Sequence, residues 1–306
     1  LHTAQLRGVQ VWGGAAAAGG QQQAPRRYLG VVVDPGDSAV TPPLLLSWEE
    51  QGGTGGTTPL NGTLTALNSL ESMDYSVALN KLVAVNQALQ LVIIDPDSGN
   101  VMEVGPIADA SKFASGGVAT IDQATNTLFF CVLDAGTSPQ NYYFISCPLN
   151  AGGFSSGNPC TNSTVSPGSQ YDSGASTGTA VESMKFDSTL QKLVVLRSEI
   201  LGASLVLVDP ATAEATDVWG FRDFTQWTLP SGMASLTALD GSTGYFYMLL
   251  NDSNDNSEEG EPSTFPTNDG LKVVVVDLQT RKQVGNTWTN IPSQSPVTGV
   301  AVWPAA

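Results

Sequence analysis

The feature that most constrains this chain is a recurring pattern of an apolar run, an aspartate, often a proline, and a second short run. It reads YLGVVVDPGDSAV at 28–40, LQLVIIDPDSGNVMEV at 89–104, SLVLVDPATAEATDV at 204–218 and KVVVVDLQTRKQV at 272–284, with a weaker copy, YYFISCPLNAGG, at 142–153. Such an aspartate can accept hydrogen bonds from backbone N–H groups two residues on, and proline presets the next φ angle. Each copy predicts a tight hairpin, with Asp34, Asp95, Asp209 and Asp277 at one structural position.

A second pattern precedes four of these copies. It reads LESMDYSVALNKLVAV at 70–85, GVATIDQATNTLFFCV at 117–132, VESMKFDSTLQKLVVL at 181–196 and LTALDGSTGYFYMLL at 236–250. We expect Asp74, Asp122, Asp187 and Asp240 to end one strand at equivalent positions, before a polar turn and a strongly apolar strand. Each unit then holds four strands, A to D, with aspartate turns at A–B and C–D.

The B and C strands are apolar at consecutive residues, as in LFFCVL and KVVVV. A strand with one solvated face alternates, so continuous runs indicate that both sheet faces are covered. The chain has no convincing amphipathic helix to cover them. In a β-propeller, four-stranded sheets are arranged radially and each covers the faces of its neighbours, so the continuous apolar runs indicate this fold.

The turn spacing predicts a single all-β domain over 1–306, a β-propeller of five four-stranded blades. In the first unit, 8–13 is interpreted as strand B and 28–34 as strand C, so this unit is predicted to have no A strand of its own. The segment PVTGVAVWP at 296–304 is predicted to be an A strand with no partner strands after it. We expect this last strand to join the first blade, because ring closure removes open sheet edges. The predicted blades are 1–50 plus 296–304, 64–107, 115–170, 177–229 and 231–290.

The short Asp-Pro-x-Thr/Ser-Gly hairpins after valine-rich runs resemble those of secreted propellers of the YVTN/NHL-like type. The resemblance covers residues 28 to 303. It implies a fold and no function, because such propellers serve many functions.

Composition and charge favour an extracellular protein that binds no nucleic acid. The net charge is −16, with 12 Lys plus Arg, whereas nucleic-acid binders need clustered cations. No apolar run is long enough to cross a bilayer. N-glycosylation sequons begin at Asn61, Asn162 and Asn251, all at expected loops or strand ends.

Three cysteines are present. Cys147 and Cys160 flank a Gly/Ser/Asn-rich loop, and we expect a disulfide there, worth about 3 kcal/mol by chain entropy. Cys131 lies in an apolar run and is expected to be a buried thiol. A Cys131–Cys147 bridge across one hairpin is the alternative.

Two segments are candidate binding sites, and both lie on the face of the long B–C and D–A loops. WGFRDFTQW at 219–227 brings together aromatic and charged side chains that can stack on sugars or anchor a protein, namely Trp219, Phe221, Arg222, Phe224 and Trp227. Packing between two blades is the alternative for these aromatics. The acidic loop 251–269 offers Asp252, Asp255, Glu258 and Glu259 as a weak Ca²⁺ candidate, although its spacing differs from an EF-hand.

Catalytic residues are not evident. Recurrent aspartates fit turn capping better than catalysis, and Glu71 and Glu182 in the A strands are the least implausible catalytic acids. His2 is the one histidine, which argues against His-dependent hydrolysis and a His-ligated zinc site. We therefore expect a non-enzymatic extracellular recognition or structural module without a cofactor, which binds a protein, a glycan or itself. The alternative is a secreted carbohydrate-active hydrolase with channel carboxylates.

Overall fold

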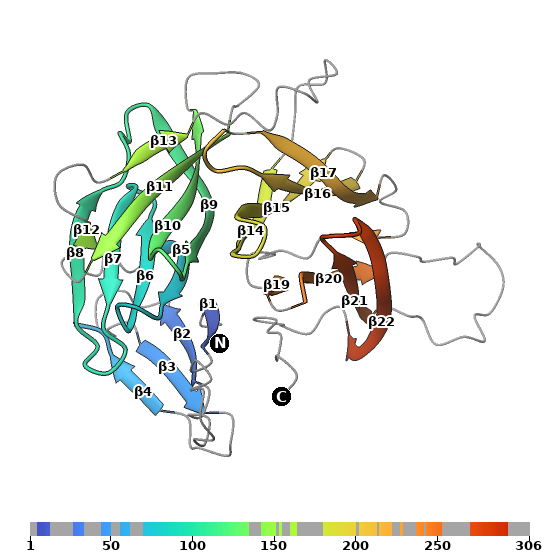
Figure 1. The fold of residues 1–306 in the computed structure, drawn as a ribbon. Helices are drawn as coiled ribbons and strands as arrows, with labels where there is room; N and C mark the ends of the chain where they lie inside the picture. The colour runs from blue at the N-terminus through green and yellow to red at the C-terminus, as the bar shows by residue number, and fades with distance from the viewer. Residues whose placement is uncertain are drawn as a thin grey trace, which may run out of the picture. The chain divides into compact units, whose positions relative to one another are not determined.

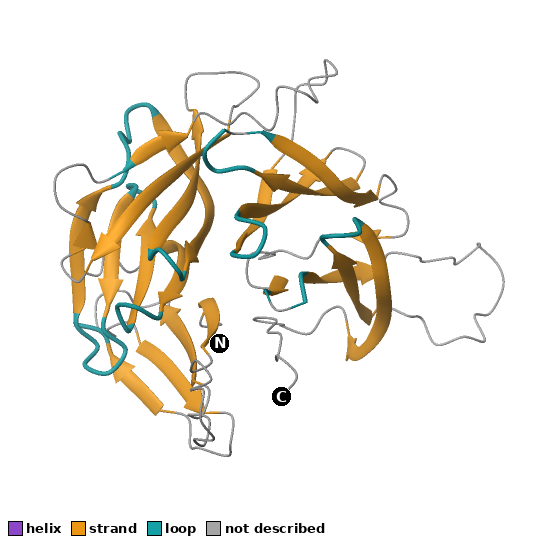
Figure 2. Ribbon diagram, in the orientation of Figure 1, coloured by secondary structure: helices purple, strands orange, loops and turns teal. Residues whose placement is uncertain are grey.

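The computed structural model divides into two compact units, Leu1–Ser166 and Pro167–Ala306, and each is described by itself. The residues that the structure describes are 5–12, 27–33, 44–49, 56–61, 70–134, 142–150, 153–154, 160–163, 180–199, 202–212, 214–221, 227–228, 237–241, 243–252 and 270–292. Within these ranges the chain forms strands and turns without helices (Figure 2). The all-β prediction is therefore confirmed for the described residues.

Among its described residues the first unit contains three antiparallel sheets, whose strands are labelled in Figure 1. The first sheet has the order β1 (Gln5–Trp12), β2 (Arg27–Val33), β3 (Leu44–Glu49) and β4 (Gly56–Pro59). The second has the order β5 (Leu70–Ser76), β6 (Lys81–Asn86), β7 (Gln90–Ile94) and β8 (Val101–Pro106). The third combines β9 (Phe113–Asp122), β10 (Thr127–Asp134) and β11 (Tyr142–Asn150), with β12 (Gly153–Phe154) and β13 (Thr161–Ser163) both pairing with β11.

The second unit contains two antiparallel sheets among its described residues. The first of them has the order β14 (Ala180–Asp187), β15 (Lys192–Glu199), β16 (Gly202–Val208) and β17 (Ala215–Phe221). In the other, β18 (Trp227–Thr228) and β19 (Thr237–Asp240) both pair with β20 (Tyr245–Asp252), which is followed by β21 (Gly270–Asp277) and β22 (Lys282–Pro292).

Apolar packing covers both faces of the second sheet, as the continuous runs predict. Along β6, Leu82 and Ala84 belong to one buried cluster, while Val83 and Val85 belong to a second. The second cluster extends to the third sheet, which lies beside the second in Figure 1. Burial of each leucine or valine of this kind contributes about 1.5–3 kcal/mol, so packing between sheets is a main source of stability.

The chain between β3 and the second sheet contains β4, and the end of this segment binds the second sheet. The N–H of Asn61 donates to Gly99 O (2.8 Å), and the N–H of Val101 donates to Asn61 O (3.3 Å). Gly99 has φ 71°, and a Cβ there would lie 2.2 Å from the Pro59 oxygen. Glycine is therefore required at this close approach.

The prediction that the first unit is without its own A strand is wrong, because the first sheet draws four strands from 5–59. Its first strand, β1, lies next to β5, the first strand of the second sheet. The predicted closing strand at 296–304 and the predicted Asp34 turn lie outside the described residues. Ring closure and the number of blades therefore stay predictions.

Candidate functional site

Three of the four predicted C–D turns are held by their aspartates, and the fourth, at Asp34, lies outside the described residues. In these three turns the aspartate ends or directly follows the third strand, and its Oδ1 accepts two backbone N–H groups. These bonds join Asp95 to Asp97 (2.9 Å) and Ser98 (3.2 Å), Asp209 to Ala211 (2.8 Å) and Thr212 (3.1 Å), and Asp277 to Gln279 (2.8 Å) and Thr280 (3.1 Å). In the third sheet the strand register places Pro148 opposite Thr127, so that turn has no aspartate.

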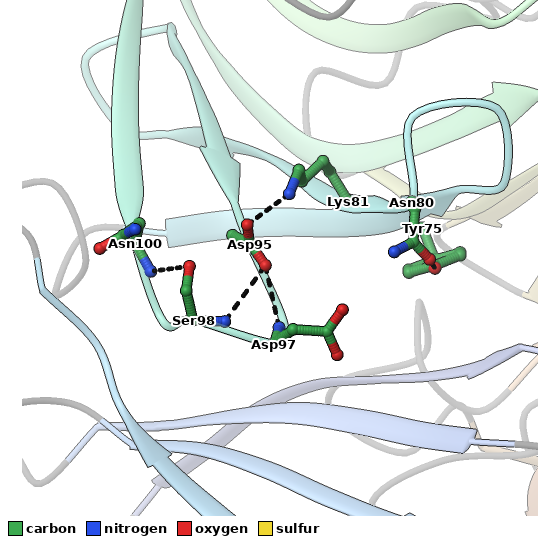
Figure 3. Close-up of polar contacts among 7 residues, drawn as sticks. All are labelled: Tyr75, Asn80, Lys81, Asp95, Asp97, Ser98 and Asn100. Carbon is green, nitrogen blue, oxygen red and sulfur yellow. Dashed lines mark hydrogen bonds and ion pairs between the residues drawn. The ribbon is translucent and has the colours of Figure 1, made fainter.

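Two of these aspartates also form ion pairs. Lys81, the first residue of β6, places its Nζ 2.5 Å from Asp95 Oδ2 (Figure 3). Lys192, the first residue of β15, pairs with Asp209 in the same way. These bonds join the A–B turn to the C–D turn, so both turn classes lie at the same end of a sheet.

The turn aspartates are acids with lowered pKa values. The hydrogen bond from Lys81, with help from the N–H groups of Asp97 and Ser98, lowers the pKa of Asp95 from 3.8 to about 2. The hydrogen bond from Lys192 likewise lowers the pKa of Asp209 to about 2. The Thr280 hydroxyl, 2.7 Å from Asp277 Oδ2, is the main cause of a lowered pKa at Asp277. A general acid at neutral pH needs a raised pKa, so these carboxylates suit turn capping.

The prediction that Asp74 shares the position of Asp122, Asp187 and Asp240 is wrong. The residue that ends the A strand of the second sheet is Ser76, which pairs with Lys81 as Asp122 pairs with Thr127 and Asp187 with Lys192. The Ser76 hydroxyl caps this turn by accepting the N–H of Leu79 (3.1 Å). Aligning the shared Glu-Ser-Met sequences at 71–73 and 182–184 would have revealed the offset.

Asp74 instead connects the second sheet to the third. Its Oδ2 accepts the N–H of Ile121 in β9 (2.8 Å). Gln123 adds two bonds to β5 and its turn: its Nε2 donates to Tyr75 O (2.7 Å), and its Oε1 accepts the N–H of Val77 (2.9 Å). The Ser76 hydroxyl donates to Asn126 Oδ1 (2.5 Å). We call these contacts the β5–β9 seam.

The corresponding β14–β19 seam in the second unit has different contacts. Gly241 and Gly244 occupy the positions of Gln123 and Asn126, one and four residues after the strand-ending aspartate. The Thr189 hydroxyl donates to Gly241 O (3.2 Å), and Ser183 and Thr237 share a buried hydrogen bond. Asp187 Oδ1 caps its own turn through Thr189 (2.8 Å) and Leu190 (3.0 Å), whereas its buried Oδ2 has no hydrogen-bond partner in the described residues.

The two candidate catalytic acids both lie at β-bulges. The register shifts between Leu70 and Ser72 and between Val181 and Ser183, which leaves Glu71 and Glu182 as the extra residues of β5 and β14. Bulges often re-aim side chains near binding sites. Glu182 is half-buried. The two acids belong to different units, so convergence of channel carboxylates stays a prediction.

The aromatic segment is divided between two sheets. Trp219 lies in β17, while Trp227 lies in β18, which pairs with β20. A bulge at Val218 places Val218 and the half-buried Trp219 against the same apolar cluster. Trp219 thus contributes to packing, which is the alternative considered for this segment. Phe221 ends β17, and Arg222 and Phe224 lie outside the described residues.

Arg197 near the end of β15 is a buried cation that sequence reasoning missed. It is 2% exposed, and its Nε and Nη2 donate to Ser204 Oγ (3.2 and 2.9 Å). Its Nη2 also lies 3.6 Å from Asp217 Oδ1 in β17. Arg197 therefore links three strands, and a lone arginine after the apolar run KLVVL was the available signal.

The predicted disulfide between Cys147 and Cys160 is present, with a Cα–Cα distance of 4.3 Å. Cys131 is a buried free thiol, and burial raises its pKa. The register pairs Cys131 with Phe144 and Cys147 with Leu128, so the alternative Cys131–Cys147 bridge does not form.

The sequon residues lie in three settings. Asn61 is exposed beyond β4, Asn162 is in β13, and Asn251 is in β20. Of the Ca²⁺ candidates, Asp252 ends β20, whereas Asp255, Glu258 and Glu259 lie outside the described residues. Across the described ranges no group of three or more His, Cys, Asp or Glu residues is arranged to hold a metal ion. No helix among those residues is long and apolar enough to cross a membrane.

No protein-family profile matches the chain, and no curated protein matches it. Its fold is similar to that of several solved structures. They include a nidogen/laminin complex (TM-score 0.47, 11% identity, covering 85% of this chain and 74% of that chain) and a DUF4221-family member from Bacteroides vulgatus (0.48, 11%, 94% and 86%). A third is the Cps50 (Swd1) β-propeller domain of Myceliophteria thermophila (0.43, 9%, 85% and 82%). These similarities concern the arrangement of strands, and no ligand or activity is transferred from them.

Proposed function

We propose that the chain is an extracellular, non-enzymatic recognition or structural module, built as a five-bladed propeller closed by 296–304. The observation that carries this proposal is the use of the repeated aspartates. Asp95, Asp209 and Asp277 bind the N–H groups of their own turns and have lowered pKa values. The repeated aspartates therefore stabilise the turns of the scaffold, and the partner binds to the long, irregular B–C and D–A loops.

An extracellular location is supported by the Cys147–Cys160 disulfide, because disulfides persist in oxidising compartments. The sequons at Asn61, Asn162 and Asn251 support N-glycosylation. The net charge of −16 disfavours nucleic acid as a partner.

The partner in this proposal is a protein, a glycan or another copy of the chain. Phe221, Arg222, Phe224 and Trp227 supply the contacts, and Trp219 supports them from the core. The module has no resident cofactor, and the acidic residues Asp252, Asp255, Glu258 and Glu259 remain its Ca²⁺ candidates.

A secreted carbohydrate-active hydrolase is the second candidate. The equivalent bulges at Glu71 and Glu182 favour it, because a bulge can direct a carboxylate out of the ladder. Such an enzyme needs two carboxylates within about 5–10 Å of each other.

A glycan array, a hydrolysis assay on the same sugars and sedimentation of the purified chain separate these functions. We expect glycan binding or concentration-dependent self-association without hydrolysis, weakened in the Arg222→Ala/Phe224→Ala variant. Gln279→Ala is the matched control, because Gln279 is exposed and lies in a C–D turn, away from the B–C and D–A loops. This variant should bind normally. Sugar hydrolysis that is lost in Glu71→Gln or Glu182→Gln would establish the hydrolase instead.

A further inference from the structure

Asn162 lies in a short strand that the disulfide holds in place. In β13, Asn162 pairs with Ile145 and Thr161 with Ser146, so the same register sets Cys160 opposite Cys147. The Cα–Cα distance of 4.3 Å agrees with directly opposed residues. The bond therefore lies one residue beyond the ladder that contains the sequon asparagine.

The pairing of β13 depends strongly on this bond. The strand has three residues and pairs only with β11 among the described strands. So short an edge strand is marginal by itself, whereas closing a 13-residue separation contributes about 3 kcal/mol by chain entropy. We expect the sequon to leave the sheet readily when both cysteines are reduced, and to stay paired when they are oxidised.

Asn61 provides an internal comparison, because its backbone is held without any cysteine. Its N–H donates to Gly99 O, and its carbonyl oxygen accepts from the Val101 N–H. General unfolding frees both asparagines, whereas loss of the disulfide alone frees Asn162.

We infer that Asn162 is an N-glycan acceptor and that the Cys147–Cys160 disulfide controls its glycosylation. The glycan is transferred to Asn162 before the disulfide forms, and formation of the disulfide ends the transfer. This inference rests on the proposed extracellular function. The usual N-glycan acceptor is an asparagine in a surface loop, so pairing of Asn162 in the β11–β13 ladder opposes transfer.

The two competing reactions are chemically distinct. In transfer, Asn162 Nδ2 forms a bond to the first sugar of a polyprenyl-pyrophosphate oligosaccharide. The sugar–phosphate bond breaks, the pyrophosphate leaves, and the amide loses a proton. In closure, the Cys147 and Cys160 thiols lose two protons and two electrons to the disulfide of a thiol oxidoreductase.

The test is expression of the full chain in a eukaryotic secretory host, with site occupancy measured on glycopeptides by mass spectrometry. Cys147→Ser/Cys160→Ser is compared with the parent chain, and brief treatment of cells with dithiothreitol during synthesis reproduces the reduced state without substitution. Thr164→Ala, added to the double variant, removes the Asn162 sequon and leaves both serines in place.

We expect partial occupancy of Asn162 in the parent chain, a rise in both reduced conditions, and loss with Thr164→Ala, while occupancy of Asn61 stays constant. Equal occupancy of Asn162 in all cysteine states, with Asn61 glycosylated, overturns the inference and leaves the extracellular proposal intact. A parallel rise at Asn61 assigns the effect to unfolding and also overturns it. Absence of glycan at both asparagines overturns the inference together with the proposed secretion.

Discussion

Asp95 and Asp209 each perform two tasks with one carboxylate. Oδ1 orders the turn by accepting two N–H groups, and Oδ2 binds the lysine that begins the neighbouring strand. The carboxyl side chains of these aspartates are only 27% and 24% exposed, so solvent screens the pairs less than it screens a fully exposed pair. Hairpin geometry and charge pairing are thereby coupled in a single residue.

The double variant Asp95→Asn/Asp209→Asn tests this coupling. Asparagine keeps the turn acceptor and removes the ion pair, so we expect the free energy of unfolding to fall by about 1 kcal/mol per site at pH 7. Both pKa values are lowered on folding, from 3.8 to about 2. The stabilisation is therefore complete above pH 4 and is lost as the pH falls towards 2.

Urea unfolding at pH 7, 4 and 2 measures the difference between parent and variant, which should shrink with decreasing pH. Lys112→Met is the control, because Lys112 and Asp109 form an exposed pair at 3.7 Å. An unchanged difference from pH 7 to pH 2 would contradict the assigned ion pairs.

At the scale of elements, the β5–β9 seam and the β14–β19 seam differ in their polar contacts. The β5–β9 seam uses side chains at Gln123 and Asn126, whereas the β14–β19 seam has glycine at both equivalent positions. Among the described residues Asp187 Oδ2 has no hydrogen-bond partner, whereas Ser76, the equivalent residue, donates to Asn126. A buried polar atom left unpaired lowers stability by about 1–3 kcal/mol.

Gly244→Asn is expected to supply the missing partner. Gly244 has φ 71°, close to the 53° of Asn126, and asparagine tolerates this region. A Cβ at Gly244 would lie 3.8 Å from the Gln279 side chain, so it fits without displacement. The asparagine amide can donate a hydrogen bond to Asp187 Oδ2, and replacing glycine reduces the conformational freedom of the unfolded chain. Together these effects should raise the free energy of unfolding by about 1 kcal/mol.

Thermal and urea unfolding measure this change, with Gly244→Ala as the control. Alanine adds a Cβ at the same positive φ without a donor, so that variant should be less stable than the parent. If both variants lose stability equally, Asp187 Oδ2 does not receive the added amide.

How well the sequence predicts a structural feature depends on how far apart in the chain the interacting residues lie. Turn caps such as Asp95–Asp97 and the two-sided burial of β6 are local, so residue order alone predicts them correctly. Asp74 was misplaced because its partner, the N–H of Ile121, is 47 residues away and belongs to another sheet. The packing of Trp219 depends on a bulge at Val218, which no local pattern specifies.

At the scale of the whole molecule, closure of the ring is the prediction with the widest consequences. The first sheet runs from β1 to β4, and the final strand is predicted to join this sheet near Val9. An open inner edge invites pairing with other chains, while a closing strand satisfies its N–H and C=O groups. Removal of 293–306 should therefore lower the melting temperature and promote oligomers, as measured by calorimetry and light scattering.

Complementation distinguishes strand pairing from a general effect of truncation. A synthetic peptide of residues 293–306 added to the shortened chain should bind it and restore thermal stability, because a strand can add to an exposed edge through main-chain bonds. The same peptide with Val300→Pro lacks one of those N–H groups and should bind more weakly. A shortened chain that keeps its melting temperature and ignores the peptide would show that 296–304 does not complete the first sheet, and the single binding face inferred from a closed ring would no longer follow.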